Sequence, residues 1–221
     1  KPKTFSVKLK APATKLAAAQ NTFVALPFND RAYTPDAFRN TANFDGEGNS
    51  YSAELMPAEI NSDGVVFQTG PVDGKHVVKC KGEKIDLPAM DKAGKLYLLV
   101  AATDEDREAT FKVDGKEYTV SVPYYSGFYG QWGYKGHTEG YVKDADIAFI
   151  GTHRHNYDKG NEPYVFTYLY KVALDVPAGA KTLELPDDQN IAVFAATLSD
   201  NPNDVVVSAF DSRALPKETA K

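Results

Sequence analysis

The amino-acid sequence predicts an all-β protein built as an antiparallel β-sandwich or jelly roll. Its 221 residues include 13 tyrosines and 12 phenylalanines but only 2 methionines, and aromatic side chains favour the half-buried surface of a sheet. Short runs of alternating apolar and polar residues recur along the chain, separated by the turn formers Gly, Pro, Asn and Asp. Helical periodicity is nearly absent, so we expect a sandwich of many short strands.

The first twenty residues differ in pattern from the rest of the chain. Thr4–Leu9 alternates like a strand, and Ala11–Gln20 contains good helix formers behind Pro12, which is tolerated in a first helical turn. We interpret residues 1–20 as the last strand of a preceding domain followed by a linker or short helix. Residues 21–211 are expected to form the sandwich, and residues 212–221 a flexible polar tail.

Within the sandwich, the clearest element is a hairpin over Thr110–Val122, because Asp114-Gly115 supplies the positive φ angles of a tight type I′ turn. Lys95–Ala102 is almost continuously apolar, as expected of a central strand buried on both faces. Tyr164–Val176 is too long for a flat strand, so a bend or bulge is expected there. The other predicted strands are Thr22–Leu26, Tyr51–Leu55, Gly64–Gln68, Lys75–Lys81, Lys84–Leu87, Ile147–His153, Thr182–Leu185, Ile191–Ser199 and Val205–Phe210.

Charge, hydropathy and cysteine content argue against nucleic-acid binding, a membrane span and an internal disulfide. The net charge is -5 and the lysines are scattered, which argues against nucleic acid as a partner, since its binding requires clustered positive charge. No apolar run is long enough to cross a membrane. Cys80 is the single cysteine, so no internal disulfide can form, and we expect it to be a small core-facing side chain.

Residues 123–140 combine five glycines with six aromatic residues, including the single tryptophan. Glycine weakens regular structure while aromatic rings favour burial, so the segment is predicted to be a loop that packs its rings against something. One interpretation is a platform on which sugar rings stack; the other is a loop core or an interface with a neighbouring domain. The candidate sugar contacts in this loop are Tyr124, Tyr125, Tyr129, Trp132, Tyr134 and His137.

The run His153-Arg154-His155 is a further candidate for sugar contact. Two histidines at i and i+2 on a strand point to the same side and could share a zinc ion, but no third ligand is evident in the sequence. The alternative is a polar strand end with hydrogen-bonded rings. We therefore expect no metal at this run.

The segment from Asp45 to Asn49 alternates oxygen-bearing side chains with glycines. Asp45, Glu47 and Asn49 could contribute to a calcium site, although Met56 stands where an EF-hand would place its bidentate glutamate. The alternative is turn chemistry, in which Asp and Asn side chains bond to their own backbone. Calcium at these three residues is therefore one alternative and a ligand-free turn the other, and no other cofactor is expected in this chain.

No catalytic residue can be assigned from the sequence. Carboxylates cluster at residues 104–106 and at 187–188, and a pair of carboxylates is what a glycosidase needs for catalysis. Both clusters lie at turns between apolar strands, however, so we interpret them as solvated turn residues. Sequence motifs of serine hydrolases, P-loop proteins and zinc proteases are absent.

Several runs resemble known modules. Residues 44–54 (FDGEGNSYSAE), followed by the strand Gly64–Phe67, resemble galactose-binding-like β-sandwich modules appended to glycosidases. Residues 127–132 (GFYGQW), 152–155 (THRH) and 178–186 (AGAKTLELP) resemble the C-terminal region of bacterial α-mannosidases of the family-38 type. Thr4–Leu9 resembles the last strand of that family's preceding β domain. The resemblance extends from Lys3 to Ser199.

The resemblance implies a non-catalytic C-terminal accessory module of a periplasmic or secreted α-mannosidase-like glycoside hydrolase. Catalytic residues and zinc would then lie in an upstream domain of the same polypeptide, which would be one partner of this chain. A mannose-containing glycan would be the other if the module binds carbohydrate. The alternative is a purely structural module that packs against the catalytic domain and binds no sugar.

Overall fold

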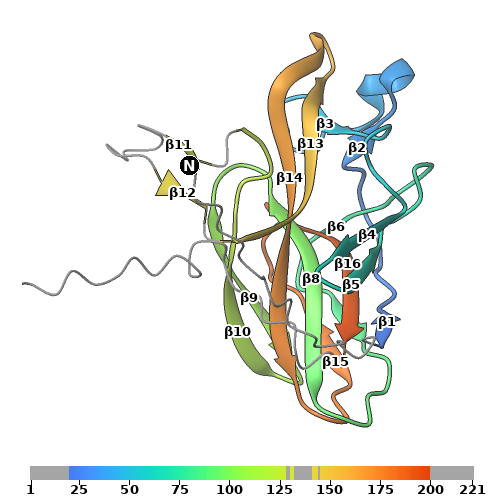
Figure 1. The fold of residues 1–221 in the computed structure, drawn as a ribbon, viewed down its shortest axis with the longest axis vertical. Helices are drawn as coiled ribbons and strands as arrows, with labels where there is room; N and C mark the ends of the chain where they lie inside the picture. The colour runs from blue at the N-terminus through green and yellow to red at the C-terminus, as the bar shows by residue number, and fades with distance from the viewer. Residues whose placement is uncertain (1–19, 128–129, 132–140, 144, 200–221) are drawn as a thin grey trace, which may run out of the picture.

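The computed structural model describes residues 20–127, 130–131, 141–143 and 145–199, and it shows two curled sheets stacked into a sandwich (Figure 1). The prediction of an antiparallel β-sandwich is confirmed, and β2–β3 is its one parallel pair among the described strands. The large sheet contains, in spatial order, β1 (Asn21–Phe23), β16 (Ile191–Ser199), β8 (Gly94–Ala102), β14 (Gly160–Val176), β13 (Asp146–Asn156), β3 (Asn49–Ser52) and β2 (Tyr33–Thr34), with β6 (Val78–Lys79) also paired to β16.

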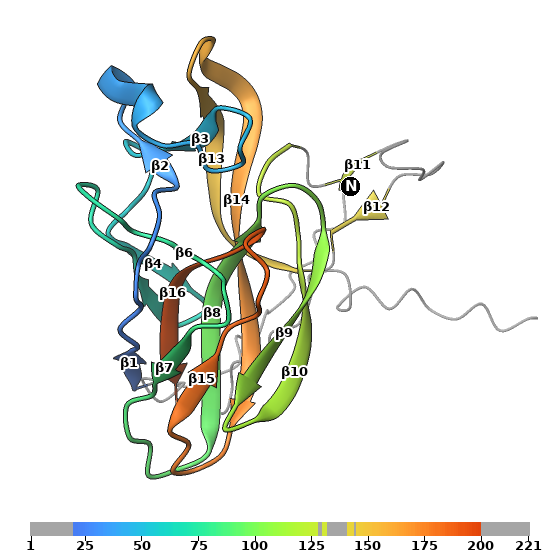
Figure 2. The ribbon, with the colours of Figure 1, turned by 180° about the vertical axis from the view of Figure 1, so that it is seen from behind.

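The small sheet packs over one face of β8 and β16, as seen from behind in Figure 2. A separate hairpin contacts β16 as well, and Thr197 of β16 donates a hydrogen bond from its hydroxyl to the Val66 carbonyl at 2.8 Å. Seven of the nine residues of β8 are buried, as predicted for a central strand, and every residue of β16 is buried as well. The small sheet is β10 (Lys116–Val122), β9 (Arg107–Val113), β15 (Thr182–Glu184) and β7 (Lys84–Asp86), and the hairpin is β4 (Glu59–Ser62) with β5 (Val65–Gln68).

The hairpin β9–β10 forms as the sequence predicts. Val113 pairs with Lys116 around a two-residue turn, in which Asp114 has φ 47° and Gly115 has φ 83°. Both values are positive, as a type I′ turn requires. Ala109, Phe111 and Val113 point into the core from alternate positions of β9.

The longest hairpin, β13–β14, extends beyond the sandwich at one end (Figure 1). Its register shifts between Ile147 and Phe149 and again between Gly151 and His153, so the expected irregularity is present. A Cβ atom at Gly151 would collide with the Thr167 hydroxyl, which explains a glycine in the ladder. The extension carries the β13–β14 turn away from the core and next to the short 3₁₀ helix η1 (Asp36–Thr41).

Several predicted strands are shorter in the structure. The strand predicted at Lys75–Lys81 is shortened to β6, because Val77 pairs with Asp30 and not with β16. The Cys80 amide donates to the Ile191 carbonyl, next to the β6–β16 pairs. β2, η1 and β4 were not predicted. Cys80 is fully buried, as expected.

The predicted strands at Thr4–Leu9 and Val205–Phe210 and the tail from residue 212 lie outside the described residues, so the predicted domain boundaries stay predictions. In the part of the chain that the structure describes, no helix is long and apolar enough to span a membrane. A further pair of short strands, β11 (Gly130–Gln131) with β12 (Tyr141–Val142), was not predicted either, and β11 lies within the segment predicted to be a loop.

Candidate functional site

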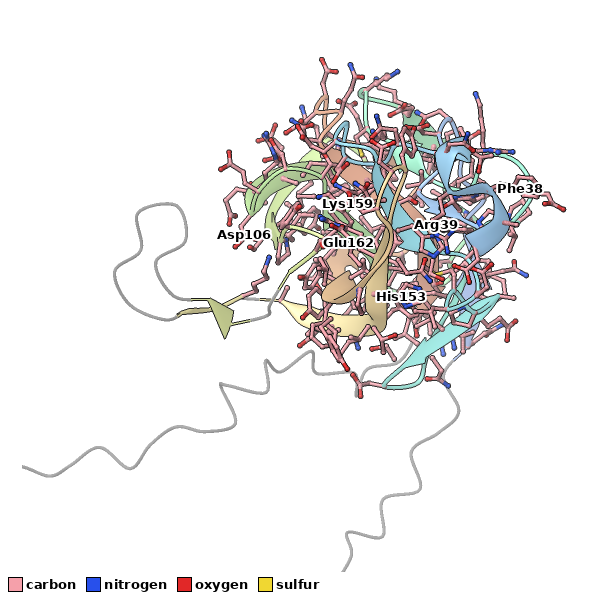
Figure 3. All side chains as sticks on the ribbon, turned by 90° about the horizontal axis from the view of Figure 1, so that it is seen from above. Phe38, Arg39, Asp106, His153, Lys159 and Glu162 are labelled. Atoms are coloured by element: carbon pink, nitrogen blue, oxygen red, sulfur yellow. The ribbon has the colours of Figure 1, made fainter. Side chains whose placement is uncertain are left out.

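Polar side chains gather where the β13–β14 hairpin meets η1. Figure 3 views this end from above, with Arg39, His153, Lys159 and Glu162 labelled around the hairpin. Successive side chains of a strand point to opposite faces, so His153 and His155 share one face of β13. On β3, Ser50 pairs with His155, and the parallel pairing of β2 with β3 brings Thr34 beside Ser52. The sheet thus collects hydroxyl and imidazole groups under η1.

His155 is completely buried at the centre of this group. Its Nδ1 lies 3.0 Å from Thr34 Oγ1, which in turn lies 2.7 Å from Ser50 Oγ. Its Nε2 lies 3.1 Å from Asp36 Oδ1. Burial lowers the pKa of His155 below its usual value, and the nearby Asp36 carboxylate only partly opposes this shift. The imidazole is therefore neutral at pH 7.

Asp36 is the first residue of η1, and its side chain is 52% exposed. A hydrogen bond from Asn161 is the main reason why the pKa of Asp36 is lowered, and the guanidinium of Arg39 adds to the effect. Arg39 Nη2 donates to Asp36 Oδ1 at 2.8 Å, and its Nε donates to Asn161 Oδ1 at 2.7 Å. The carboxylate is thus ionised and held in place.

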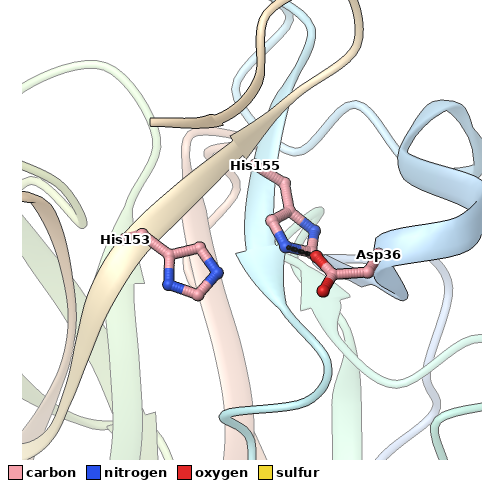
Figure 4. Close-up of side chains that lie close together, drawn as sticks. All are labelled: Asp36, His153 and His155. Atoms are coloured by element: carbon pink, nitrogen blue, oxygen red, sulfur yellow. Dashed lines mark ion pairs between the residues drawn. The ribbon is translucent and has the colours of Figure 1, made fainter. Parts of the chain in front are cut away.

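One ligand-type atom each from Asp36, His153 and His155 lies within 4.8 Å of the others (Figure 4). The sequence suggested the two histidines but not the aspartate. Asp36 precedes the two histidines by more than a hundred residues and lies in a segment without strand or motif signals, so no feature of the sequence could have identified it as their neighbour. Only the packing of η1 against β13 brings it to the histidines.

A hollow of about 460 Å³ opens between η1 and the β13–β14 turn. The ring of Tyr157 packs against Gly48, where an added Cβ would lie 3.3 Å from the ring, and Tyr157 donates its amide to the Gly48 carbonyl at 3.0 Å. Tyr157 is nevertheless 38% exposed. The hollow is lined by Asp36, Ala37, Arg39, Asn40, Tyr157, Asp158, Lys159 and Gly160.

Arg154, the middle residue of the predicted run, does not join the histidines. It points to the opposite face of β13, and its Nε and Nη2 lie 2.8 Å and 2.6 Å from Glu162 Oε2. This ion pair links neighbouring strands of the hairpin. His153 is half-buried and His155 is buried, so His153 is the more accessible of the two.

The start of the aromatic segment belongs to the core. Tyr125 is fully buried, its ring contacts Phe44 edge-on at 5.0 Å between centroids, and its hydroxyl donates to Asp45 Oδ2 at 2.7 Å. It therefore has no surface to offer a sugar, as the loop-core alternative expects. Tyr124 is half-buried and packs on Tyr125. The other candidates of this loop, Tyr129, Trp132, Tyr134 and His137, lie outside the described residues.

The Asp45 segment has the hydrogen bonding of a turn. Asp45 Oδ1 accepts the amides of Glu47 and Asn49 at 2.9 Å and 3.2 Å, and Oδ2 accepts the Asn49 side-chain amide at 2.8 Å. With the Tyr125 hydroxyl, four donors from the chain itself occupy this carboxylate. Gly46 and Gly48 take positive φ angles of 83° and 81°. The arrangement matches the turn alternative, and the calcium site stays a prediction.

These features define a β-sandwich domain with a polar hollow at one end. The family model of the AziU2-like beta-sandwich domain matches residues 20–202, and the chain therefore belongs to this family. No curated protein matches the sequence.

Solved structures similar to this chain come from carbohydrate-active proteins. One is the catalytic domain of a GH87 alpha-1,3-glucanase in complex with nigerose, with 11% identity and a TM-score of 0.37 over 83% of this chain. This chain spans 28% of the length of that structure. A GH26-CBM35 beta-(1,4)-mannanase from Podospora anserina has 12% identity and a TM-score of 0.31, covering 82% of this chain and 27% of its own. The CBM35 of Abf62 from Cellvibrio japonicus has 12% identity and a TM-score of 0.30, covering 66% and 89%. With TM-scores below 0.5, none of them identifies a function for this chain.

Proposed function

We propose that this chain is a non-catalytic accessory module of a carbohydrate-active enzyme and that it binds a glycan in the hollow between η1 and the β13–β14 turn. The observation that carries the proposal is the lining of this hollow. It places an exposed tyrosine ring beside carboxylate, guanidinium, amide and ammonium groups. Sugars have apolar C–H faces that stack on aromatic rings and hydroxyls that bond to such polar groups.

The polar groups of the hollow are ordered without a ligand. Arg39 is fixed between Asp36 and Asn161, and the Asn156 side-chain oxygen accepts the amides of Asp158 and Lys159 at 3.0 Å each. Groups that are already ordered lose little conformational entropy when a ligand binds. The volume of about 460 Å³ also lies within the range of small-molecule sites.

The carboxylates that the sequence offered as acid pairs support a non-catalytic role. Asp104 and Asp188 both form ion pairs with Arg107. Hydrogen bonding from Arg107 lowers the pKa of Asp104, whereas the general acid of a glycosidase needs a raised pKa.

The resemblance noted in the sequence extends the proposal to the parent protein. We infer an α-mannosidase-like hydrolase, periplasmic or secreted, whose upstream catalytic domain is the intramolecular partner of this module. The glycan would then contain mannose. The competing possibility is a structural module that packs on the catalytic domain without binding sugar.

The proposal is tested by isothermal titration of the chain with mannose-containing oligosaccharides and with α- and β-glucans. Tyr157→Ala is expected to weaken binding about 5- to 150-fold, taking as a scale the roughly 1–3 kcal/mol that an aromatic side chain contributes when a nucleic-acid base stacks on it. Tyr164→Ala is the matched control, since Tyr164 is 76% exposed on the same hairpin but does not line the hollow. Absence of binding by the unmodified chain would favour the structural module. Binding that survives Tyr157→Ala but is lost in Trp132→Ala would move the site to the aromatic segment.

A further inference from the structure

We propose that Asp36, His153 and His155 bind one divalent transition-metal ion, with zinc as the best match to these ligands. The sequence led us to expect no metal at the two histidines, and the proposal revises that expectation. It does not depend on glycan binding in the hollow. Two imidazoles and one carboxylate are ligands that zinc accepts in three-residue sites with a fourth position open to solvent or ligand. Calcium and magnesium prefer oxygen ligands alone, so the histidines disfavour them.

The spacing of two of the ligands fits a shared ion. Zn–N and Zn–O bonds of about 2.0–2.1 Å at a tetrahedral angle place the two ligand atoms ~3.3 Å apart. His155 Nε2 and Asp36 Oδ1 are 3.1 Å apart, yet their geometry is not that of a hydrogen bond. Figure 4 shows a ring nitrogen of His153 directed toward this pair. His153 is the ligand that must shift, because the group as a whole spans up to 4.8 Å.

Both histidines present an unsatisfied nitrogen. The Nε2 atoms of His153 and His155 are buried from solvent, and neither has a hydrogen-bond partner within the described part of the chain. Burying a polar atom without a partner is unfavourable. A bound ion would accept the lone pairs of both nitrogens and remove this deficit.

The surrounding residues fix the orientation of the ligands. Nδ1 of His155 lies against Thr34 Oγ1, and when it donates its proton there, Nε2 keeps the lone pair that a metal requires. Arg39 and Asn161 hold the carboxylate of Asp36. Metal-binding histidines and carboxylates in proteins characteristically have such outer partners.

The exposed part of Asp36 lines the hollow, so the fourth position of the ion would face it. A water molecule or a ligand hydroxyl could complete the coordination there.

The experiment uses the untagged chain after treatment with a chelator. Zinc chloride is titrated in competition with a chromogenic zinc indicator, and we expect one ion per chain. Asp36→Asn and His153→Ala are expected to weaken zinc binding at least about tenfold, since even outer-shell changes at metal sites cost 10–100-fold. The matched controls are Asp158→Asn, a carboxylate of the same hollow outside the cluster, and His137→Ala; neither should change the affinity.

Cobalt(II) provides a second readout, because a tetrahedral site gives intense visible absorption bands, which Asp36→Asn should remove. If a variant fails to fold, the imidazole nitrogen chemical shifts of the unmodified chain report the same ligands when zinc is added. The proposal is overturned if the unmodified chain binds no zinc at micromolar concentrations. It is equally overturned if both ligand variants bind zinc as the unmodified chain does, or if His137→Ala removes the binding.

Discussion

His76 is expected to make the stability of the domain depend on pH between 4 and 7. Its ring is 1% exposed and stacks on Tyr33 with 3.5 Å between centroids and 13° between planes. Its Nε2 accepts the backbone amides of Ala32 and Tyr33 at 2.8 Å and 3.1 Å. A proton on Nε2 would face two N–H donors, so the folded state requires the neutral ring.

The size of the effect follows from the pKa. Burial lowers the pKa of His76 from 6.5 to about 4, although the carbonyls of Pro71 and Gly74 act in the opposite direction. The unfolded chain therefore binds a proton in this range while the folded chain does not. The stabilisation is complete above pH 6.5 and is lost as the pH falls toward 4. Each pKa unit corresponds to ~1.4 kcal/mol, so the full loss is about 3 kcal/mol.

The measurement is urea unfolding followed by far-UV circular dichroism at several pH values. The unmodified chain should lose about 3 kcal/mol of unfolding free energy between pH 7 and pH 4 through His76. His76→Gln keeps an acceptor for the amides but cannot titrate, so its curve should be flatter. Some slope will remain, because the pKa of His155 is also lowered. Parallel curves for the two proteins, or a pKa of His76 near 6.5 by NMR, would refute the reasoning.

Four further predictions follow from burial and backbone geometry. Cys80 is buried, which raises the pKa of its thiol, so a thiol reagent should label it only when the domain unfolds; rapid labelling of the native chain would contradict this. Phe111→Ala should lower the unfolding free energy by about 3–5 kcal/mol in chemical denaturation, because it empties the core beneath the small sheet. Gly115→Ala should lower it by only ~1–2 kcal/mol, the cost of a side chain at φ 83°, since no atom lies near the added Cβ; a larger loss would mean that the turn is packed. Tyr125→Phe should cost about 1.5–3 kcal/mol by removing the hydrogen bond to Asp45, and an unchanged melting temperature would show that water replaces that donor.

The elements that the sequence predicted well are those formed by neighbouring residues. The Asp114-Gly115 turn and the alternation on either side of it specify the β9–β10 hairpin almost by themselves. The apolar run of β8 likewise indicated burial on both faces. By contrast, β2 has only two residues, Tyr33 and Thr34, and it becomes a strand only because β3 lies beside it. Nothing in its local sequence could have identified it.

The residues of the candidate site were likewise predictable only where the local sequence determines their position. The sequence by itself placed His153 and His155 on one face of a strand, because side-chain alternation is a property of the local backbone. It also identified residues 123–140 as an unusual aromatic segment. Only the tertiary structure decided that Tyr125 is buried on Phe44 and Asp45, that Arg154 pairs with Glu162 on the other face, and that Asp36 joins the histidines. These outcomes depend on contacts between residues far apart in the chain, and the pattern of one segment does not specify which distant segment will pack against it.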